Sequence, residues 1–231
     1  MKILALDSSA KACSVAITDD NRILGSFFIN TALTHSQTLV PMIDSLLKNT
    51  NTDLKEIDRI AVSAGPGSFT GVRIGVSAVK GIAMPSDIPC VSVSTLEAMP
   101  YNVIERDAVV CAVMDARCGQ VYNALFDVID GNVTRLCDDR ALSIEELGKE
   151  LKTFRKKIVL VGDGAELCYN SFKEFSVDIS LAFESQRYQN AVGVAMAAGE
   201  KEIISASELM PSYLRLPQAE RELKKKTEGK Q

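Results

Sequence analysis

The segment from residue 65 to residue 73 has the residue types of a loop that holds an anion or a binding partner: it reads Gly65-Pro66-Gly67-Ser68-Phe69-Thr70-Gly71-Val72-Arg73. It follows an apolar run at 59–63 and opens a helical pattern, so backbone amides would be free at a helix N-terminus. A dinucleotide fingerprint would need glycine at Thr70, and a P-loop would need Gly-Lys-Ser or Gly-Lys-Thr, which the chain lacks. The glycines allow positive φ or close backbone approach, and Ser68 or Thr70 can cap the helix. A nucleotide or partner loop and a tight, capped turn both fit.

Few other side chains suit catalysis. His35 is the only histidine, which excludes two-histidine metal sites. It lies at the start of a predicted helix, where we expect a capping or interface role. Ser68 lacks the flanking glycines of a nucleophile elbow. Asp7 and Asp115 each end an apolar strand and could either orient a metal-bound nucleotide or accept hydrogen bonds from their own turns.

The composition is that of an ordinary globular protein. With 231 residues, 46% hydrophobic and 24% charged, the chain can bury one large core or two small ones. Its formal net charge of -4 argues against an autonomous nucleic-acid binder, so any RNA contact is expected to be shared with a partner. The six cysteines include no Cys-x-x-Cys pair, which favours reduced, packed thiols. No membrane-spanning stretch or signal peptide is evident, and we expect a cytoplasmic protein.

The pattern of elements occurs twice. Alternation and helical spacing predict strands at 3–7, 13–18, 22–30, 59–63 and 90–93, with helices at about 36–48, 68–83 and from 94. They predict further strands at 109–115, 120–128, 132–136 and 158–161, with helices at 143–154 and after 164. We therefore predict a duplicated βββαβα fold with lobes at 1–104 and 105–219 and a polar tail at 220–231. This arrangement resembles the α/β superfamily of actin, Hsp70 and the sugar kinases, whose two lobes close on ATP.

Motifs spread over residues 7–215 carry a more specific resemblance. They are Asp7-Ser8-Ser9, Cys13-Ser14-Val15-Ala16, Thr34-His35-Ser36, the 65–73 segment, Asp115-Ala116-Arg117 with Val121-Tyr122, and Pro211-Ser212-Tyr213-Leu214-Arg215. Together they resemble the TsaB (YeaZ) family. The resemblance implies a non-catalytic subunit of the bacterial tRNA threonylcarbamoyladenosine machinery that binds and activates the catalytic subunit TsaD, with TsaE in the same complex. It implies that tRNA is contacted only through the complex.

The resemblance also bears on catalysis. The sister catalytic family holds a metal through a His-x-x-x-His pair just after the strand that is 90–93 here, and Thr95 and Met99 occupy those two positions in this chain. Neither side chain is an adequate ligand. The resemblance therefore implies no catalytic residue, no metal and no cofactor. The alternatives are a glycoprotease-like metallopeptidase, a small-molecule kinase of the same superfamily, and a homodimeric module that acts without TsaD.

Two predicted helices carry more apolar surface than one sheet face can cover. The helix after the glycine turn has one stripe at Val72, Val76, Val79 and Ala83 and another at Gly71, Gly75, Ala78 and Ile82, and the earlier helix adds Leu39, Ile43, Leu46 and Leu47. The resemblance implies that this helix pair meets the equivalent pair of TsaD. We predict that the valine stripe and the earlier helix face the partner, and that the same patch forms a homodimer when TsaD is absent. A binding or structural loop is predicted from Asp7, Gly65, Gly67, Ser68, Thr70, Gly71 and Arg73.

Overall fold

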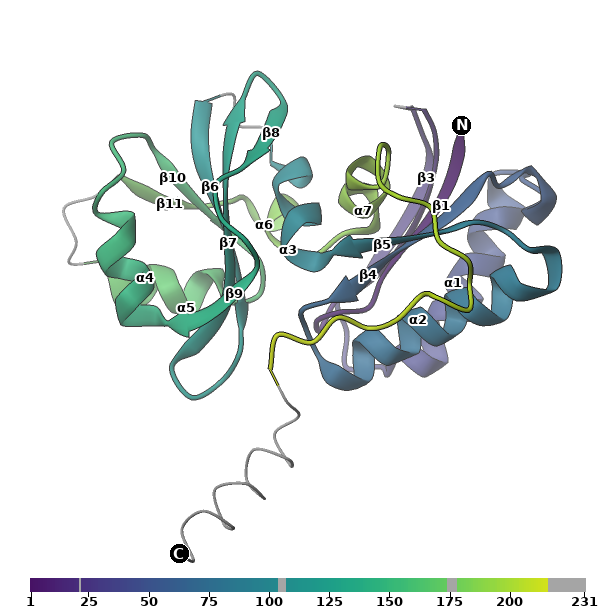
Figure 1. The fold of residues 1–231 in the computed structure, drawn as a ribbon, viewed down its shortest axis with the longest axis horizontal. Coiled ribbons are helices and arrows are strands. Elements are labelled where there is room, and N and C mark those ends of the chain that lie inside the picture. Colours follow the sequence, from purple (N-terminus) through teal and green to yellow (C-terminus); the bar gives the residue numbers. More distant parts are fainter. Residues whose placement is uncertain (21, 104–106, 174–177, 216–231) are drawn as a thin grey trace, which may run out of the picture.

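The computed structural model describes residues 1–20, 22–103, 107–173 and 178–215. Figure 1 shows two lobes side by side, each built on one sheet. The first sheet has the strand order β3-β2-β1-β4-β5, with β1 Lys2–Asp7, β2 Cys13–Asp19, β3 Arg22–Ile29, β4 Arg59–Gly65 and β5 Cys90–Ser94. β1, β2 and β3 form an antiparallel meander, whereas β4 and β5 run parallel to β1.

Helices cover both faces of the first sheet. Leu4 and Leu6 of β1 pack under α1 (His35–Asn49) and α2 (Phe69–Ala83). Ile3 and Ala5 point the other way and pack against α7 (Ala191–Ala197). Because successive side chains of a strand alternate between faces, burial on both faces explains why β1 is apolar throughout rather than alternating.

The second sheet has the order β11-β10-β6-β7-β8, and β9 pairs with β7. Its strands are β6 Asp107–Asp115, β7 Gln120–Ile129, β8 Asn132–Arg135, β9 Arg140–Ser143, β10 Ile158–Val161 and β11 Ile179–Leu181. One face packs on α4 (Ile144–Leu151) and α5 (Ala165–Phe172). The other face packs on α3 (Thr95–Ala98) and the 3-10 turn Met99–Asn102, which lie between the lobes. The short helix α6 (Glu184–Arg187) precedes α7, and two further 3-10 turns are Leu54–Glu56 and Met84–Ser86.

The predicted α/β fold with a duplicated βββαβα unit is confirmed, but the assignment of residues 105–219 to the second lobe is wrong for its last part. After α6 the chain returns to the first lobe, where Ala191 and Val194 of α7 are fully buried against the first sheet. The sequence predicted helix after residue 164 but not this helix by itself, because its seven residues are all apolar or glycine and give no amphipathic period. The predicted lobe boundary at 104–105 and the polar tail at 220–231 lie outside the described residues.

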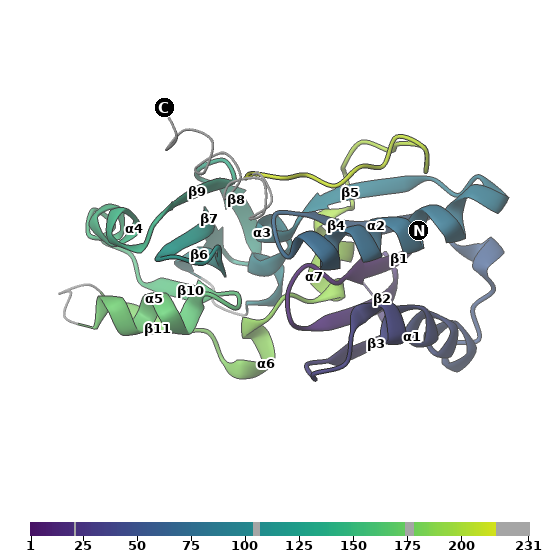
Figure 2. The same ribbon diagram turned by 90° about the horizontal axis from the view of Figure 1, so that it is seen from below.

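Beyond α7, the chain forms an extended segment on the first lobe, here called the C-terminal strap (residues 203–215). Figures 1 and 2 show it running beside α2 towards the gap between the lobes. Leu209 anchors it in the first core, and Ile204 pairs with Cys90 at the end of β5. No helix among the described residues is long and apolar enough to cross a membrane.

Candidate partner groove and inter-lobe cleft

The glycine-rich segment forms a tight turn from β4 into α2, as predicted. Ser68 is the N-cap residue of α2, and its hydroxyl accepts the Gly71 backbone N–H at 3.3 Å. The Ser68 backbone N–H donates to the carbonyl of Ser9 at 2.7 Å, which fastens the turn to the loop after β1. Gly65 has φ of +121° and lies against the strap, where a Cβ would meet the Ser212 carbonyl oxygen at 2.2 Å. Glycine is required there by both conformation and space.

Asp7 is buried directly beneath this turn. One carboxylate oxygen accepts the backbone N–H and the hydroxyl of Ser9 at 2.9 and 2.8 Å, and the other accepts the Ser63 hydroxyl at 2.5 Å. Burial raises the pKa of Asp7, and these hydrogen bonds oppose the rise. Of the two roles that the sequence left open, this geometry fits a carboxylate that stabilises its own turn.

The loop after β1 also grips the first turn of α2. The Ser8 hydroxyl donates to the Gly71 carbonyl at 2.9 Å. A Cβ on Gly71 would lie 2.1 Å from the Ser8 carbonyl oxygen, so the two backbones are in close approach. The glycine at 71 thus serves helix packing, because any side chain would push α2 away from β1.

His35 fastens the start of α1 to the same loop. Its Nε2 lies 2.7 Å from the Ala10 carbonyl and therefore carries the proton that it donates. The His35 Nδ1 is buried and has no hydrogen-bond partner among the residues that the structure describes. The N-cap position of α1 belongs to Thr34. Of the capping or interface role predicted for His35, the capping role is therefore wrong, and the side chain ties the helix to the loop. The interface role stays a prediction.

The structure corrects the predicted partner stripe. Val72, Val76, Val79 and Ala83 are at most 4% exposed and lie in the core of the chain, together with Leu39, Ile43 and Leu46 of α1. Leu47 is partly buried against the same core. The reason is that α2 is covered on several sides, by β4, by α1 and by the strap, whose Ser207 carbonyl accepts a hydrogen bond from Lys80. The sequence showed two apolar stripes on α2, but it did not show that the strap also packs against this helix.

An open groove of about 580 Å³ remains between α1 and α2. It is lined by His35, Ser36, Leu39, Val40, Phe69, Thr70, Arg73, Ile74, Ser77 and Ala78. Val40 is 54% exposed, and Ile74 and Ala78 are partly exposed. The uncovered apolar surface of the helix pair is therefore made by these residues rather than by the valine stripe.

One end of the groove is closed by an aromatic clamp, defined as Phe69, Arg73 and Tyr213. The two rings stack with centroids 4.8 Å apart, and the Arg73 guanidinium lies 3.8 Å from the centre of the Phe69 ring. The Arg73 Nε also donates to the Tyr213 hydroxyl at 2.8 Å. Arg73 was predicted as a loop residue, but its partners Phe69 and Tyr213 were not. The only sequence signal for Tyr213 was its place in the 211–215 motif.

Beyond the clamp lies a cleft of about 560 Å³ between the lobes. The first lobe contributes the loop after β1 and the glycine turn, the second contributes the β6–β7 turn and Asp163, and the strap closes one side. Desolvation raises the pKa of Asp163 to about 6; a Gln189 hydrogen bond of 2.8 Å opposes the rise, and the nearby carboxylates of Asp115 and Asp7 add to it. Because the side chain is still more than a third exposed, solvent screens part of this effect.

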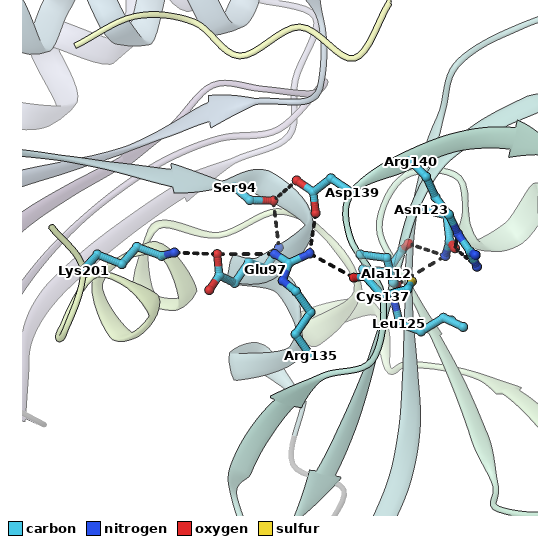
Figure 3. A network of polar contacts seen from close by, with 11 residues as sticks. Ser94, Glu97, Ala112, Asn123, Leu125, Arg135, Cys137, Asp139, Arg140 and Lys201 are labelled. Atoms are coloured by element: carbon cyan, nitrogen blue, oxygen red, sulfur yellow. Dashed lines mark hydrogen bonds and ion pairs between the residues drawn. The ribbon is translucent and has the colours of Figure 1, made fainter. Parts of the chain in front are cut away.

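A polar network holds the lobes together behind the cleft (Figure 3). Arg135 of β8 lies 2.7 Å from the Asp139 carboxylate and 3.4 Å from the Glu97 carboxylate of α3. Lys201, after α7, pairs with the same Glu97 at 2.8 Å. The hydroxyl of Ser94, at the end of β5 in the first lobe, donates a hydrogen bond to the Asp139 carboxylate. The network therefore joins β5, α3 and the segment after α7 to the second sheet.

The two positions that align with metal-binding histidines are buried. Thr95 and Met99 are both fully buried, and no described residue forms a hydrogen bond with the Thr95 hydroxyl. Within the described ranges, no group of three histidine, cysteine, aspartate or glutamate side chains is arranged to hold a metal ion.

Two duplicated lobes, a cleft between them and an aspartate at the end of each first strand define this chain as a two-lobed α/β protein of the actin-like class. The family model described as "TsaD: tRNA N6-adenosine threonylcarbamoyltransferase" matches residues 27–223. A TsaB of Buchnera aphidicola subsp. Schizaphis graminum is 30% identical over 197 residues, which are 82% of this chain and 89% of the relative. The chain belongs to the TsaB (YeaZ) family, within the wider group that the TsaD model describes.

Two further relatives cover nearly the whole chain. The "tRNA threonylcarbamoyladenosine biosynthesis protein TsaB" of Bacillus subtilis is 29% identical over 225 residues, 95% of this chain and 96% of the relative. A Pseudomonas aeruginosa protein described as similar to peptidase YEAZ matches in structure with a TM-score of 0.79 and 27% identity, covering 93% of this chain and 99% of the other. The family resemblance read from the motifs is thus confirmed.

Proposed function

We propose that this chain is a non-catalytic subunit of tRNA threonylcarbamoyladenosine synthesis that binds and activates a TsaD-type catalytic subunit through the groove between α1 and α2. The observation that carries the proposal is this groove. It leaves apolar side chains of two long helices uncovered at Val40, Ile74 and Ala78. Two neighbouring helices share this apolar surface. A second pair of helices can bury the surface and so complete a four-helix bundle.

The proposal of a non-catalytic role is supported by how the candidate catalytic groups are used. The Asp7 carboxylate accepts three protein hydrogen bonds and is 1% exposed, which leaves little room for it to hold a metal-bound nucleotide. His35 bonds to a backbone carbonyl. We further propose that TsaE joins the same complex, that tRNA is bound only by the assembled complex, and that the groove forms a homodimer when TsaD is absent.

The decisive test is co-expression with the TsaD encoded in the same genome, followed by threonylcarbamoylation of tRNA with and without this chain. We expect co-purification and modification that depends on the chain. The purified chain alone should show no ATPase activity and no stoichiometric zinc or iron. Turnover by the isolated chain would instead favour the kinase or metallopeptidase alternatives.

Two valine variants locate the interface. Val40→Glu places a charge at an exposed groove position and should abolish co-purification with TsaD and any homodimer while leaving the thermal midpoint nearly unchanged. Val76→Glu places the same charge at a position that is 4% exposed and should lower the free energy of unfolding by several kcal/mol, about 3 or more. A folded Val40→Glu variant that still binds TsaD would place the interface elsewhere.

A further inference from the structure

The inter-lobe cleft has a cationic rim, defined as Lys11, Arg117 and Arg215. Lys11 lies in the turn between β1 and β2, Arg117 in the turn between β6 and β7, and Arg215 at the end of the strap; all three line the cleft. The two turns occupy equivalent places in the duplicated units, so their cations approach the cleft from opposite lobes. Lys11 and Arg117 are both exposed.

None of these three side chains has a carboxylate within ion-pair distance among the residues that the structure describes. Among the described residues, the Arg215 guanidinium donates to the Ala116 carbonyl, at 3.3 Å. The exposed Lys149, by contrast, pairs with Glu145. Three cations without a carboxylate partner among the described residues thus line one cleft of a chain whose net charge is -4.

Two carboxylates, those of Asp115 and Asp163, line the same cleft as the cationic rim. Asp115 accepts the backbone N–H of Arg117 at 2.7 Å within its own turn. Asp163 accepts the Gln189 amide at 2.8 Å. Both short side chains are thus held by protein donors, whereas the long cationic side chains are left for an external anion.

Aromatic rings lie beside the rim. Phe69 and Tyr213 of the aromatic clamp line the cleft as well, and Tyr213 is 41% exposed. Tyr122 lines it from β7. The Phe69 ring is covered by Tyr213 and Arg73, so Tyr213 is the ring left exposed beside the rim. Cations beside an exposed ring are an arrangement by which proteins hold a phosphate backbone and stack on an unpaired base.

We propose that the cationic rim is the surface through which this chain contacts RNA in the assembled complex. This inference rests on the proposed function, because it takes tRNA as the substrate of the complex. The negative charge of the whole chain explains why the rim would act together with a partner surface rather than alone.

The test compares two charge-reversal pairs in the complex with TsaD. Lys11→Glu/Arg117→Glu removes rim charge. Lys55→Glu/Arg155→Glu makes the same change in net charge at exposed residues before β4 and β10, at the strand ends opposite the cleft. Binding of an unmodified tRNA transcript is measured by fluorescence anisotropy over a range of KCl concentrations. We expect the rim pair to weaken binding about tenfold and to lower the salt slope by about 2, and the control pair to change binding less than about twofold.

Complex assembly is measured separately by size-exclusion chromatography, so the two ideas fail in different ways. Failure of the wild-type chain to assemble with TsaD overturns the proposed function. Normal assembly with equal tRNA binding by both charge-reversal pairs overturns only the rim. If the Lys11→Glu/Arg117→Glu variant fails to assemble with TsaD, the RNA proposal is also overturned, because the rim would then be a protein interface. Loss of ATP binding with tRNA binding unchanged would replace the RNA surface with a nucleotide site.

Discussion

At the scale of single residues, the loop after β1 shows how a carboxylate can serve structure. Asp7 accepts hydrogen bonds from the Ser9 backbone, the Ser9 hydroxyl and the Ser63 hydroxyl. Those donors come from β1's own turn and from β4, the strand that leads into the glycine turn. The carboxylate therefore holds together the two backbone segments on which α2 begins.

Asp7→Ala should lower the free energy of unfolding by about 3 kcal/mol, because three buried donors lose their acceptor at once. Asp7→Asn keeps the shape and one acceptor oxygen, so its loss should be about half as large or less. Urea denaturation of the two variants beside wild type checks this. Equal stability of Asp7→Ala and wild type would mean that the hydrogen bonds contribute nothing net.

Asp163 predicts a pH dependence with a definite sign. Its pKa rises to about 6 in the folded protein, so the unfolded chain loses this proton first as pH increases and the folded state binds more protons. The contribution of Asp163 to stability is therefore full below about pH 4 and is lost as pH rises to about 6. After discounting for solvent screening, the loss is about 1 kcal/mol.

Asp163→Asn isolates that contribution, because the amide keeps the shape but does not titrate. Between pH 4 and 6.5, the difference in free energy of unfolding between wild type and the variant should shift by about 1 kcal/mol against wild type. Denaturation at matched ionic strength across this range gives the measurement. A constant difference over the range contradicts the raised pKa.

At the scale of elements, α2 depends on close backbone contact at its first turn and on open space at its last. A Cβ at Gly71 would lie 2.1 Å from the Ser8 carbonyl oxygen, whereas a Cβ at Gly81 would meet nothing within 4 Å. Gly71→Ala should therefore lower the free energy of unfolding by about 3 kcal/mol as α2 is pushed off β1. Gly81→Ala should raise it by about 0.5 to 1 kcal/mol through helix propensity.

Chemical denaturation of the two alanine variants makes a matched pair within one helix. Because Gly71 also lies beside the groove, Gly71→Ala should weaken TsaD binding as well, whereas Gly81→Ala should not. Two variants of equal stability would show that the loop after β1 can yield to a side chain at 71.

The elements themselves were largely predictable from sequence, since apolar runs and turn residues mark β1 to β5 and the glycine turn directly. The contact between α2 and the strap was not predictable, because the strap approaches α2 from more than 120 positions away, as the Lys80–Ser207 hydrogen bond shows. The same holds for the aromatic clamp, where Arg73 and Tyr213 are separated by 140 positions. Contacts between segments so far apart in the sequence leave no periodic signal in the helix against which they pack.

At the scale of the whole molecule, a polar network holds the two lobes together. Arg135 lies at the centre of the polar network. It pairs with Asp139 on its own lobe and with Glu97 of α3, which lies between the lobes, and its guanidinium also lies 4.9 Å from the centre of the Phe126 ring. The three charged side chains are 18–29% exposed, so solvent screens them only in part. The groove lies on one lobe, and the cationic rim is shared by both. If the groove binds TsaD while the rim contacts RNA in the same complex, the two lobes must keep their relative position.

Arg135→Ala should lower the free energy of unfolding by about 2 kcal/mol, because it leaves two partly buried carboxylates without their shared cation. Arg135→Lys should recover less than half of the loss, since one ammonium cannot reach both carboxylates as a guanidinium fork does. The control is Lys149→Ala, which breaks an exposed helical ion pair and should change stability by less than about 0.5 kcal/mol. Urea denaturation measures stability, and small-angle X-ray scattering of Arg135→Ala should show a larger radius of gyration as the lobes separate. If Arg135→Ala matches Lys149→Ala in stability and wild type in radius, then the apolar contacts of α3 alone fix the lobes, and the polar network is incidental.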